Sequence, residues 1–406
     1  MYNLKIKVSD SMTEYSGMYT NENGMIRIPK TLQQQTQLEV GQSLQFNTVD
    51  KKVIVLKVGA AYQSDTDDDN SICYVTKQVF EQINIENTEY YKMEPINNIT
   101  LGCDPEFFLI DKYTRKVLRA YLFFKKWGEV GCDGVLAELR PKPSTTPLEL
   151  TDNIYELICT TRNIINTNSV YDPERITLHA ASGYQMATAG FHLHFGLPKN
   201  ILGKTPNTML LMHQVVRVMD YYIGIPAIML EGNTDAARRS NIFVTYGKPG
   251  DFRLDDRTLE YRVAGGSLLR HPILTRGLIA LGEVVTQDVI SRIKLSTNGF
   301  KHLYWAQSDE RLKEMYPDIL NTIDTYNIIC SPSIMAAKNH LDRIYSGIKK
   351  MISYEKRKNE IDELFNLILT DVQFNNNIEY NWRNFYEQVP KLHKSSNKTT
   401  ALSTAG

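Results

Sequence analysis

The sequence predicts an α+β fold made of three structured regions and a polar tail. Residues 1–95 carry short β-branched or alternating runs split by turn residues, which predicts a small β-rich domain. Residues 96–297 alternate strand-like segments with helical ones and form the expected core. Residues 298–390 show the periodicity of amphipathic helices, which we expect to pack on that core. Residues 391–406 are small and polar, so we expect them to be disordered.

The composition argues against several classes of protein. The chain has 406 residues, of which 42% are apolar, and 46 Lys and Arg balance 46 Asp and Glu, so no bulk positive field favours nucleic acid. The longest apolar stretch, Tyr221–Leu230, is about half the ~20 residues that a membrane span requires. Residues Met1–Val8 alternate like a strand and lack the pattern of a secretion signal. We expect a cytoplasmic protein, in its own cell or in a host, without membrane contact.

The strands of the first region are predicted at Met25–Pro29, Ser43–Phe46 and Lys52–Lys57. In the second and third regions, Pro147–Asn166 and Ile334–Lys356 show the apolar spacing of helices.

Four short segments of the second region carry polar side chains two positions apart with apolar neighbours between them. In a strand, residues i and i+2 share a face, so each segment aims both polar groups into one space. Solvent-facing strand positions usually carry Thr, Lys, Ser or Gln, whereas these positions hold only carboxylate, imidazole or guanidinium groups. The pairs are Asp104 with Glu106, Glu138 with Arg140, His192 with His194, and Glu260 with Arg262.

The carboxylates and imidazoles of these pairs are of the types that bind divalent cations. Mg²⁺ prefers carboxylate oxygens, so Glu106, Glu138 and Glu260 are candidate ligands of ions that bridge nucleotide phosphates. Imidazole at His192 or His194 is a further candidate ligand or phosphate donor.

Arginine presents a fixed fork of donors that matches a phosphate group. Arg253, Arg262 and the pair Arg238–Arg239 therefore suit the γ-phosphate of a nucleotide and the charge that develops as it moves. A zinc hydrolase stays open as an alternative, although its strongest sequence signature, H-E-x-x-H, is absent.

Together, five motifs in this order resemble the carboxylate-amine ligase family often encoded by bacteriophages, the type 2 amidoligases of the glutamine synthetase-like superfamily. They are Gly102–Phe107, Glu138–Pro141, Gly190–His194, Tyr246–Arg253 and Glu260–Arg262. The likeness covers residues 98–290, about half of the chain.

The resemblance implies a curved antiparallel sheet, flanked by helices, whose concave face binds ATP and Mg²⁺. It also implies that ATP phosphorylates a carboxylate and that an amine then attacks the acyl phosphate to leave an amide. By position, Glu106, Glu138 and Glu260 would be metal ligands with His192 beside them. Catalytic phosphate contacts would come from Arg239, Arg253 and Arg262, and the groups expected around the nucleotide are Glu138, Arg140, His192, His194, Arg253 and Arg262.

The segment Gly24–Lys30 followed by Leu38–Leu44 resembles the AbrB-type swapped-hairpin domain. Such domains dimerise by intertwining and often bind DNA, which implies a homodimer through residues 1–60 or a DNA contact. Because basic residues barely exceed acidic ones in that stretch, assembly is favoured over DNA binding.

Besides the zinc hydrolase, two alternatives to a ligase remain at this point. One is a non-enzymatic DNA-binding or assembly protein led by the AbrB-like segment, and the other is a phosphotransferase of the guanidino-kinase type. For a ligase, the carboxylate and the amine are small molecules or peptides, which no sequence signature identifies.

Overall fold

The computed structural model describes residues 5–8, 25–28, 33, 43–47, 53–60, 72–82, 90–93, 99–185, 187–197, 206–240, 246–255, 258–296, 312–313, 315–331 and 334–388. Among these residues, none of the helices combines the length and apolarity that crossing a membrane demands. The predicted disordered tail, residues 391–406, lies outside the described residues.

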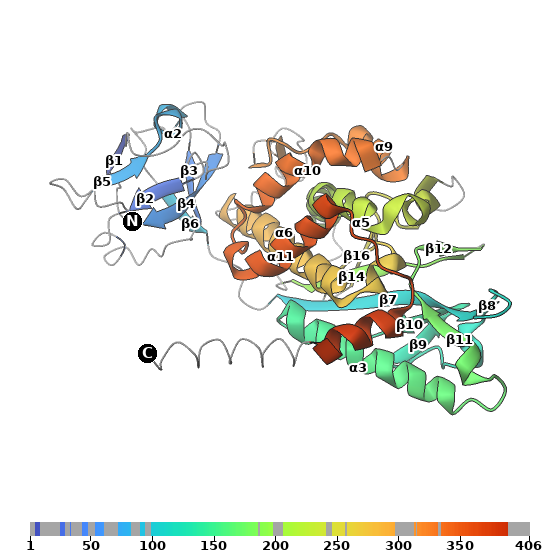
Figure 1. Ribbon diagram of the computed structural model, residues 1–406. Coiled ribbons are helices and arrows are strands. Elements are labelled where there is room, and N and C mark those ends of the chain that lie inside the picture. Colours follow the sequence, from blue (N-terminus) through green and yellow to red (C-terminus); the bar gives the residue numbers. More distant parts are fainter. Residues whose placement is uncertain are drawn as a thin grey trace, which may run out of the picture.

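The first region forms a six-stranded sheet with its own hydrophobic core (Figure 1, blue). Its strand order is β1 (Lys5–Val8), β5 (Ile72–Val75), β2 (Met25–Ile28), β4 (Val53–Ala60), β3 (Ser43–Asn47) and β6 (Tyr90–Met93), with helix α2 at Lys77–Gln82. The three predicted strands are confirmed as β2, β3 and β4. The AbrB-type resemblance stays a prediction, because the Pro-Lys turn that carries it lies outside the described residues.

The second region is built on an eight-stranded sheet centred on the long strand β7 (Thr100–Asp111). All of its strand pairs are antiparallel, which confirms the expected antiparallel sheet of an α+β fold. The order is β15 (Phe252–Leu254), β16 (Thr258–Tyr261), β14 (Phe191–Gly196), β7, β10 (Leu136–Leu139) and β9 (Val130–Asp133); β8 (Val117–Leu118) and β11 (Ile176–His179) pair with the far half of β7. A small hairpin joins β12 (Gly183–Tyr184) to β13 (Ala187–Thr188).

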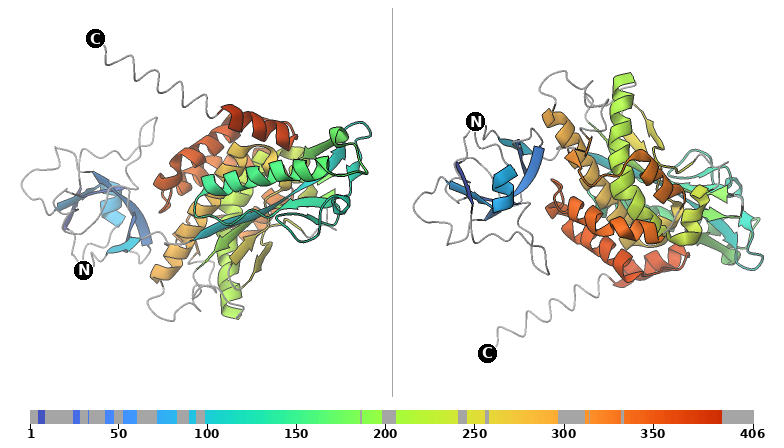
Figure 2. Two further views of the ribbon diagram at one scale, coloured as in Figure 1. Left: turned by 90° about the horizontal axis from the view of Figure 1, so that it is seen from below. Right: turned by 90° about the horizontal axis from the view of Figure 1, so that it is seen from above.

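Two helices cover one face of this sheet. Helix α3 (Pro147–Asn166) begins where Thr146 accepts the N–H of Glu149 and Pro147 occupies the first turn, so its predicted bounds are confirmed. It contacts β7, β10 and helix α6 (Pro272–Ser296), which itself contacts β14. The left view of Figure 2 shows α3 (green) lying along β7 (cyan). The polar residues of the sheet lie on its opposite face, away from this helical layer.

The remaining helices share the core of the second region. They are α4 (Pro206–Met219), a π-helical turn (Asp220–Gly224), α5 (Ile225–Ala236), α9 (Thr322–Cys330), α10 (Ile334–Ile348), α11 (Lys358–Thr370) and a last helix over 378–388. One buried cluster runs from Ile99 to Trp382, whose indole N–H donates to the carbonyl of Leu269. Helices α10, α11 and the last helix therefore pack on the second region.

The predicted helix Ile334–Lys356 is too long. Helix α10 ends at Ile348, and a short 3-10 turn, Glu355–Arg357, precedes α11. The reason is tertiary: the carboxylate of Asp288 in α6 accepts the backbone N–H of Ile352 at 3.2 Å. That contact draws residues 349–354 onto α6 and out of the helical path.

Candidate active site

The polar pairs predicted from the sequence lie side by side across neighbouring strands. Because side chains alternate along each strand, residues that are opposite in register share a face of the sheet. The opposed pairs are Glu138 with Glu106, Asp104 with His192, His194 with Glu260, and Glu260 with Arg253. Arg140 and Arg262 lie one position beyond the ends of β10 and β16, not inside the strands as expected. The four segments therefore do meet on one face.

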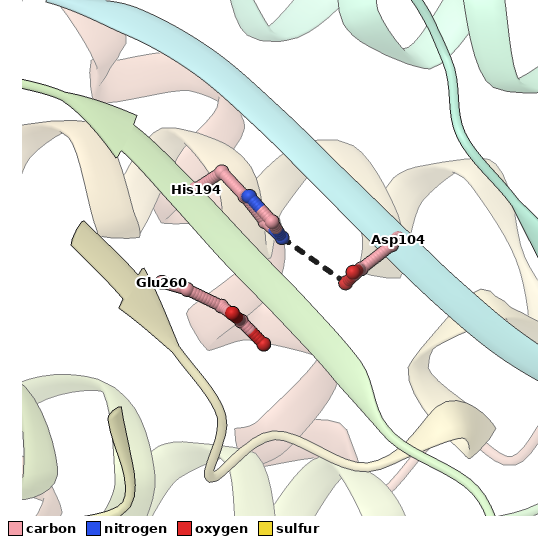
Figure 3. A group of neighbouring side chains, drawn as sticks. All are labelled: Asp104, His194 and Glu260. Atoms are coloured by element: carbon pink, nitrogen blue, oxygen red, sulfur yellow. Dashed lines mark ion pairs between the residues drawn. The ribbon is translucent and has the colours of Figure 1, made fainter. Parts of the chain in front are cut away.

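Three of these side chains converge on a single point. One ligand atom from each of Asp104, His194 and Glu260 lies within 4.8 Å of the other two. Figure 3 shows the three side chains on β7, β14 and β16 pointing toward one another, with His194 Nε2 3.2 Å from Asp104 Oδ1. In the described part of the chain, Asp104 Oδ1, His194 Nε2 and Glu260 Oε1 are buried without a hydrogen-bond partner. Two carboxylates and an imidazole with unsatisfied ligand atoms fit a divalent cation.

The electrostatics of Asp104 and His194 favour their charged forms. Burial acts to raise the pKa of Asp104, but the close imidazoles of His192 and His194 outweigh it and hold that pKa below its usual range. For His194, burial acts to lower the pKa, and the contact with Asp104 outweighs it and raises the pKa. Each group thus stabilises the charge of the other.

The other histidine connects the group to Tyr246. The Nδ1 atom of His192 lies 2.9 Å from Asp104 Oδ1 and 3.4 Å from Glu260 Oε1. Its Nε2 atom contacts the Tyr246 hydroxyl, which donates to Glu106 Oε2 at 3.0 Å. His192 therefore lies beside the convergent group, while Glu106 is reached through Tyr246.

Glu106 and Glu138 form a second carboxylate pair on the face. Glu106 also accepts the N–H of Gly190 at 2.7 Å, and Glu138 pairs with Arg140. Burial raises the pKa of Glu106 and raises that of Glu138 to about 7. Two carboxylates opposite each other on adjacent strands repel when both are charged, so this pair is a second place where a cation would be stabilised.

Three predicted arginines surround the carboxylates. Arg262 Nε lies 3.0 Å from Glu260 Oε1, and its guanidinium lies over the Tyr246 ring at 4.9 Å. Arg253 reaches within 3.8 Å of Glu260 Oε1 with a side chain that is 64% exposed. Arg140 donates to the carbonyl of Gly128 at 3.0 Å on the far side. Arg262 and Arg253 therefore lie beside Glu260, and Arg140 lies beside Glu138.

Arg239 does not join them. Its guanidinium donates to both carboxylate oxygens of Glu231 at 2.9 and 2.5 Å and to the carbonyls of Val263 and Gly247. The side chain has no solvent exposure, and these hydrogen bonds all go to acceptors within the protein. The expectation that Arg239 contacts phosphate does not match this environment.

Its neighbour Arg238 is also buried, but part of its guanidinium group lacks hydrogen-bond partners in the described part of the chain. The Arg238 side chain is buried beside Tyr246, with its guanidinium 5.7 Å from the ring, yet its Nε and Nη1 atoms have no hydrogen-bond partner among the described residues. Unsatisfied buried donors are costly, which makes Arg238 the better candidate for an anion contact.

A pocket of about 230 Å³ opens beside the convergent group. Asp104 and His194 form one wall, Arg140 and Thr258 contribute polar groups, and Pro141 is among its apolar residues. A bound group in this pocket would lie against the candidate cation site.

The sequence did not identify every residue of the site. Asp104 was recognised in a polar pair but not as a ligand, and Tyr246 was seen only within a motif. Glu231, which fixes Arg239, lies in helix α5 and carries no local signal of that contact.

Comparison with known proteins gives a family match. A family model described as "Phage phiEco32-like COOH.NH2 ligase-type 2" matches residues 101–332. No curated protein matches the chain.

Similar solved structures include a bifunctional glutathione synthetase from Pasteurella multocida, with 10% identity over 67% of this chain and a TM-score of 0.41. The alignment covers 47% of that chain, so it spans less than half of the protein. Ligand-free GmaS has 12% identity over 65% of this chain and 72% of its own (TM-score 0.34), and a glutamine synthase homolog has 15% identity over 64% and 70% (TM-score 0.27). At these TM-scores the three likenesses assign no role to any residue. The family model covers more than half of the sequence, and the chain therefore belongs to the phage phiEco32-like COOH.NH2 ligase-type 2 family.

Proposed function

We propose that the chain is an ATP-dependent carboxylate-amine ligase that forms an amide through an acyl-phosphate intermediate. The observation that carries this proposal is the convergence of Asp104, His194 and Glu260 beside Arg262 and Arg253. Family membership supports the bond that is made, and the grouping of cation ligands with guanidinium groups supports the use of a nucleotide.

Asp104, His194 and Glu260 would hold a divalent cation such as Mg²⁺, with Glu106 and Glu138 available for a second one. Such an ion, when bound, would neutralise charge on the triphosphate and polarise its phosphoryl oxygens. His192 positions Asp104 from the adjacent strand, since its Nδ1 atom lies 2.9 Å from Asp104 Oδ1.

The arginines would act on the group that is transferred. A carboxylate oxygen of the substrate attacks the γ-phosphorus, the bond to the bridging oxygen breaks and ADP leaves. The amine nitrogen then attacks the acyl carbon, inorganic phosphate leaves, and the amine proton passes to a nearby base. Arg262, Arg253 and Arg238 would stabilise the negative charge on the phosphoryl oxygens in both steps.

The substrates would be a small-molecule or peptide carboxylate and an amine. The 230 Å³ pocket beside Asp104 and His194 would hold one reacting end, with Arg140 to attract a negative group. A larger substrate would extend from this pocket along the polar face.

The test is an assay of ADP and phosphate release by the full chain with Mg²⁺, ATP and pools of carboxylates and amines. We expect both products only when a carboxylate and an amine are present together. ADP without inorganic phosphate, alongside a stable phosphorylated product, would instead indicate a guanidino-kinase type of transfer. Hydrolysis that needs no nucleotide would contradict both.

Glu260→Gln is the sharpest variant for this test. It keeps the shape of the side chain but removes the charge that contacts His192, Arg262 and the candidate cation. Losing one preorganised electrostatic group typically costs on the order of 100-fold in rate, so we expect at least that loss in ADP release. Glu156→Gln, exposed on helix α3, is the control and should keep wild-type activity.

A further inference from the structure

A surface segment, residues 119–127, combines exposed aromatic and basic side chains next to the candidate active site. It lies between β8 and β9 in the chain, and β9 is the last strand in the order of the second region's sheet. Trp127 is 77% exposed, and Tyr121 and Leu122 are exposed as well. Tyr and Trp are enriched at surfaces that bind another molecule, so this segment is a candidate binding surface.

The charge of this segment is one-sided. Arg119, Lys125 and Lys126 are exposed, and residues 112–128 contain no Asp or Glu, although acidic and basic residues balance over the whole chain. In the part of the chain that the structure describes, no carboxylate lies at ion-pair distance from Lys125 or Lys126. A surface with unbalanced positive charge attracts a partner of negative charge.

The segment also borders a hollow of about 490 Å³, which is lined by residues 121–126 and Cys132. The Cys132 thiol donates to the carbonyl of Phe124 at 3.4 Å, and the Phe123 ring packs on Tyr171 at 5.1 Å. These contacts hold the segment against β9 and against the chain that follows α3. The volume falls within the roughly 300–1,000 Å³ of ligand sites, which leaves room for a short stretch of peptide.

Arg140 connects this surface to the candidate active site. Its Nη1 atom donates to the carbonyl of Gly128 at 3.0 Å, and its guanidinium pairs with Glu138 on the polar face. Arg140 also lines the 230 Å³ pocket of the candidate site. A substrate chain that leaves this pocket past Arg140 therefore meets the segment at Gly128, one residue from Trp127.

We propose that residues 119–127 bind an acidic peptide segment that carries the carboxylate substrate. Because this assignment rests on the ligase function proposed above, the reacting carboxylate would lie in the 230 Å³ pocket beside Arg140. Further carboxylates of the same peptide would pair with Lys126, Lys125 and Arg119, and its apolar atoms would contact Trp127.

Two observations favour an acidic peptide over single-stranded nucleic acid, the other polymer that basic and aromatic residues bind together. The Nζ atom of Lys126 lies over the Trp127 ring at 5.2 Å, and the guanidinium of Arg119 lies over the Tyr121 ring at 5.9 Å. A ring with a cation over it offers less of its face to a stacked base, whereas the cation can still pair with a carboxylate. Nucleic acid also offers no carboxylate for the proposed ligase to activate.

The first experiment measures peptide binding to the full chain without ATP, by fluorescence anisotropy. The probe is a labelled peptide of alternating glutamate and alanine. The comparison probes are the same peptide with glutamine in place of glutamate and a single-stranded oligothymidylate of equal length. We expect the glutamate peptide to bind at least about tenfold more tightly than either comparison probe. No binding of the glutamate peptide, or equal binding of the glutamine peptide, would overturn the proposal, and equal or tighter binding of the oligothymidylate would overturn it in favour of nucleic acid.

Variants then locate the bound peptide. Lys125→Gln/Lys126→Gln and, separately, Trp127→Ala should each weaken binding about tenfold. All three side chains are exposed, so circular dichroism should show an unchanged fold. The control, Lys338→Gln/Lys350→Gln, removes the same net charge from two other exposed positions and should bind as the wild type does. Equal weakening in the control, or wild-type affinity in both variants of the segment, would overturn the assignment to this surface.

ADP release tests the link to the active site. With Mg²⁺, ATP and the amine pool, the glutamate peptide should have a KM at least about tenfold below that of free glutamate, and Lys125→Gln/Lys126→Gln should remove this difference. If free carboxylates support ADP release and the peptide has no lower KM, the peptide assignment is wrong and the ligase function stands. If the peptide binds through this surface but no carboxylate and amine release ADP and phosphate, the ligase function is wrong.

Discussion

Two adjacent arginines of the candidate site differ in what surrounds their charge. Arg239 forms a two-pronged ion pair with Glu231, whereas Arg238 Nε approaches Glu231 no closer than 4.0 Å. Burial and the neighbouring Arg239 lower the pKa of Arg238 to about 10. Two buried guanidinium groups thus face one carboxylate at close range, which leaves positive charge for an anionic ligand to neutralise.

Substitution should separate these two roles. Arg239→Gln leaves Glu231 buried without its main partner, so we expect a loss of about 3–5 kcal/mol in the free energy of unfolding. Arg238→Gln removes a charge with two unsatisfied donor atoms, Nε and Nη1, so stability should change by less than about 1 kcal/mol while ADP release falls about 100-fold. Urea denaturation and the ADP assay measure the two effects. If Arg239→Gln instead lowers ADP release and Arg238→Gln lowers the free energy of unfolding, then Arg239 is the phosphate contact.

The carboxylate pair on β7 and β10 predicts a dependence of stability on pH. Burial raises the pKa of Glu138 from an ordinary value of 4.5 to about 7. The folded protein therefore holds a proton at Glu138 that the unfolded chain has already lost. This contribution to stability is present below about pH 4.5 and is lost as the pH rises through about 7.

Glu138→Gln should flatten that loss in metal-free buffer. Urea denaturation between about pH 5 and about pH 8 would show a falling free energy of unfolding for the wild type and a shallower slope for the variant. Glu129→Gln, an exposed carboxylate nearby in sequence, should keep the wild-type slope. Parallel curves for wild type and Glu138→Gln would mean that Glu138 is ionised throughout.

At this scale the sequence predicted which side chains share a face, but not which atoms meet. Alternation placed His192 and His194 together, and only the register of β14 against β16 sets His194 opposite Glu260. Register depends on pairing between segments far apart in the chain, which spacing within one segment does not reveal. Likewise, the burial of Arg239 follows from helix α5, which brings Glu231 beneath it.

At the scale of elements, the start of β14 depends on a residue without a side chain. A Cβ atom added at Gly190 would lie 2.1 Å from the Tyr246 hydroxyl oxygen and 2.7 Å from His192 Nε2. Gly190→Ala should therefore displace Tyr246 from Glu106 and lower ADP release by at least about tenfold. The two displaced atoms are side-chain ends, so the melting temperature should change little by comparison.

A double variant checks this explanation. Tyr246→Phe removes the hydroxyl that the new methyl group would strike, so the effects of Gly190→Ala and Tyr246→Phe should be far from additive. Additive losses of activity in the Gly190→Ala/Tyr246→Phe double variant would mean that the glycine acts through something other than Tyr246.

Elements with local signals were predicted well. Helix α3 carries its own N-terminal cap and proline, so its bounds follow from the sequence alone. The end of α10 does not follow from the sequence alone, because the Asp288 carboxylate accepts the backbone N–H of Ile352, 64 residues away. Bounds set by long-range hydrogen bonds are beyond what periodicity can show.

At the scale of the whole molecule, the hydrophobic cores define the units. The first region has a separate cluster that includes Ile26 and Val75, while the cluster of the second region continues into α10, α11 and the last helix. The boundary near residue 96, which a change of sequence pattern indicates, stays a prediction. The arrangement within the first sheet was not predicted, since β1 and β2 form parallel pairs with β5 and β4, which lie far along the chain.

Two truncations follow from this division. Removal of residues 1–95 takes away a unit with its own core, so the remaining chain should fold, keep its cooperative unfolding and bind MgATP. Removal of residues 298–406 exposes the side of α6 that packs on α11. It also deletes Trp382, a fully buried side chain that donates a hydrogen bond to the carbonyl of Leu269, so the shortened chain should fail to fold. Circular dichroism, thermal unfolding and nucleotide titration distinguish the outcomes. If the chain that ends at residue 297 folds and binds nucleotide, the C-terminal helices are not needed for either property. If removal of residues 1–95 abolishes MgATP binding, the first region supports the active site.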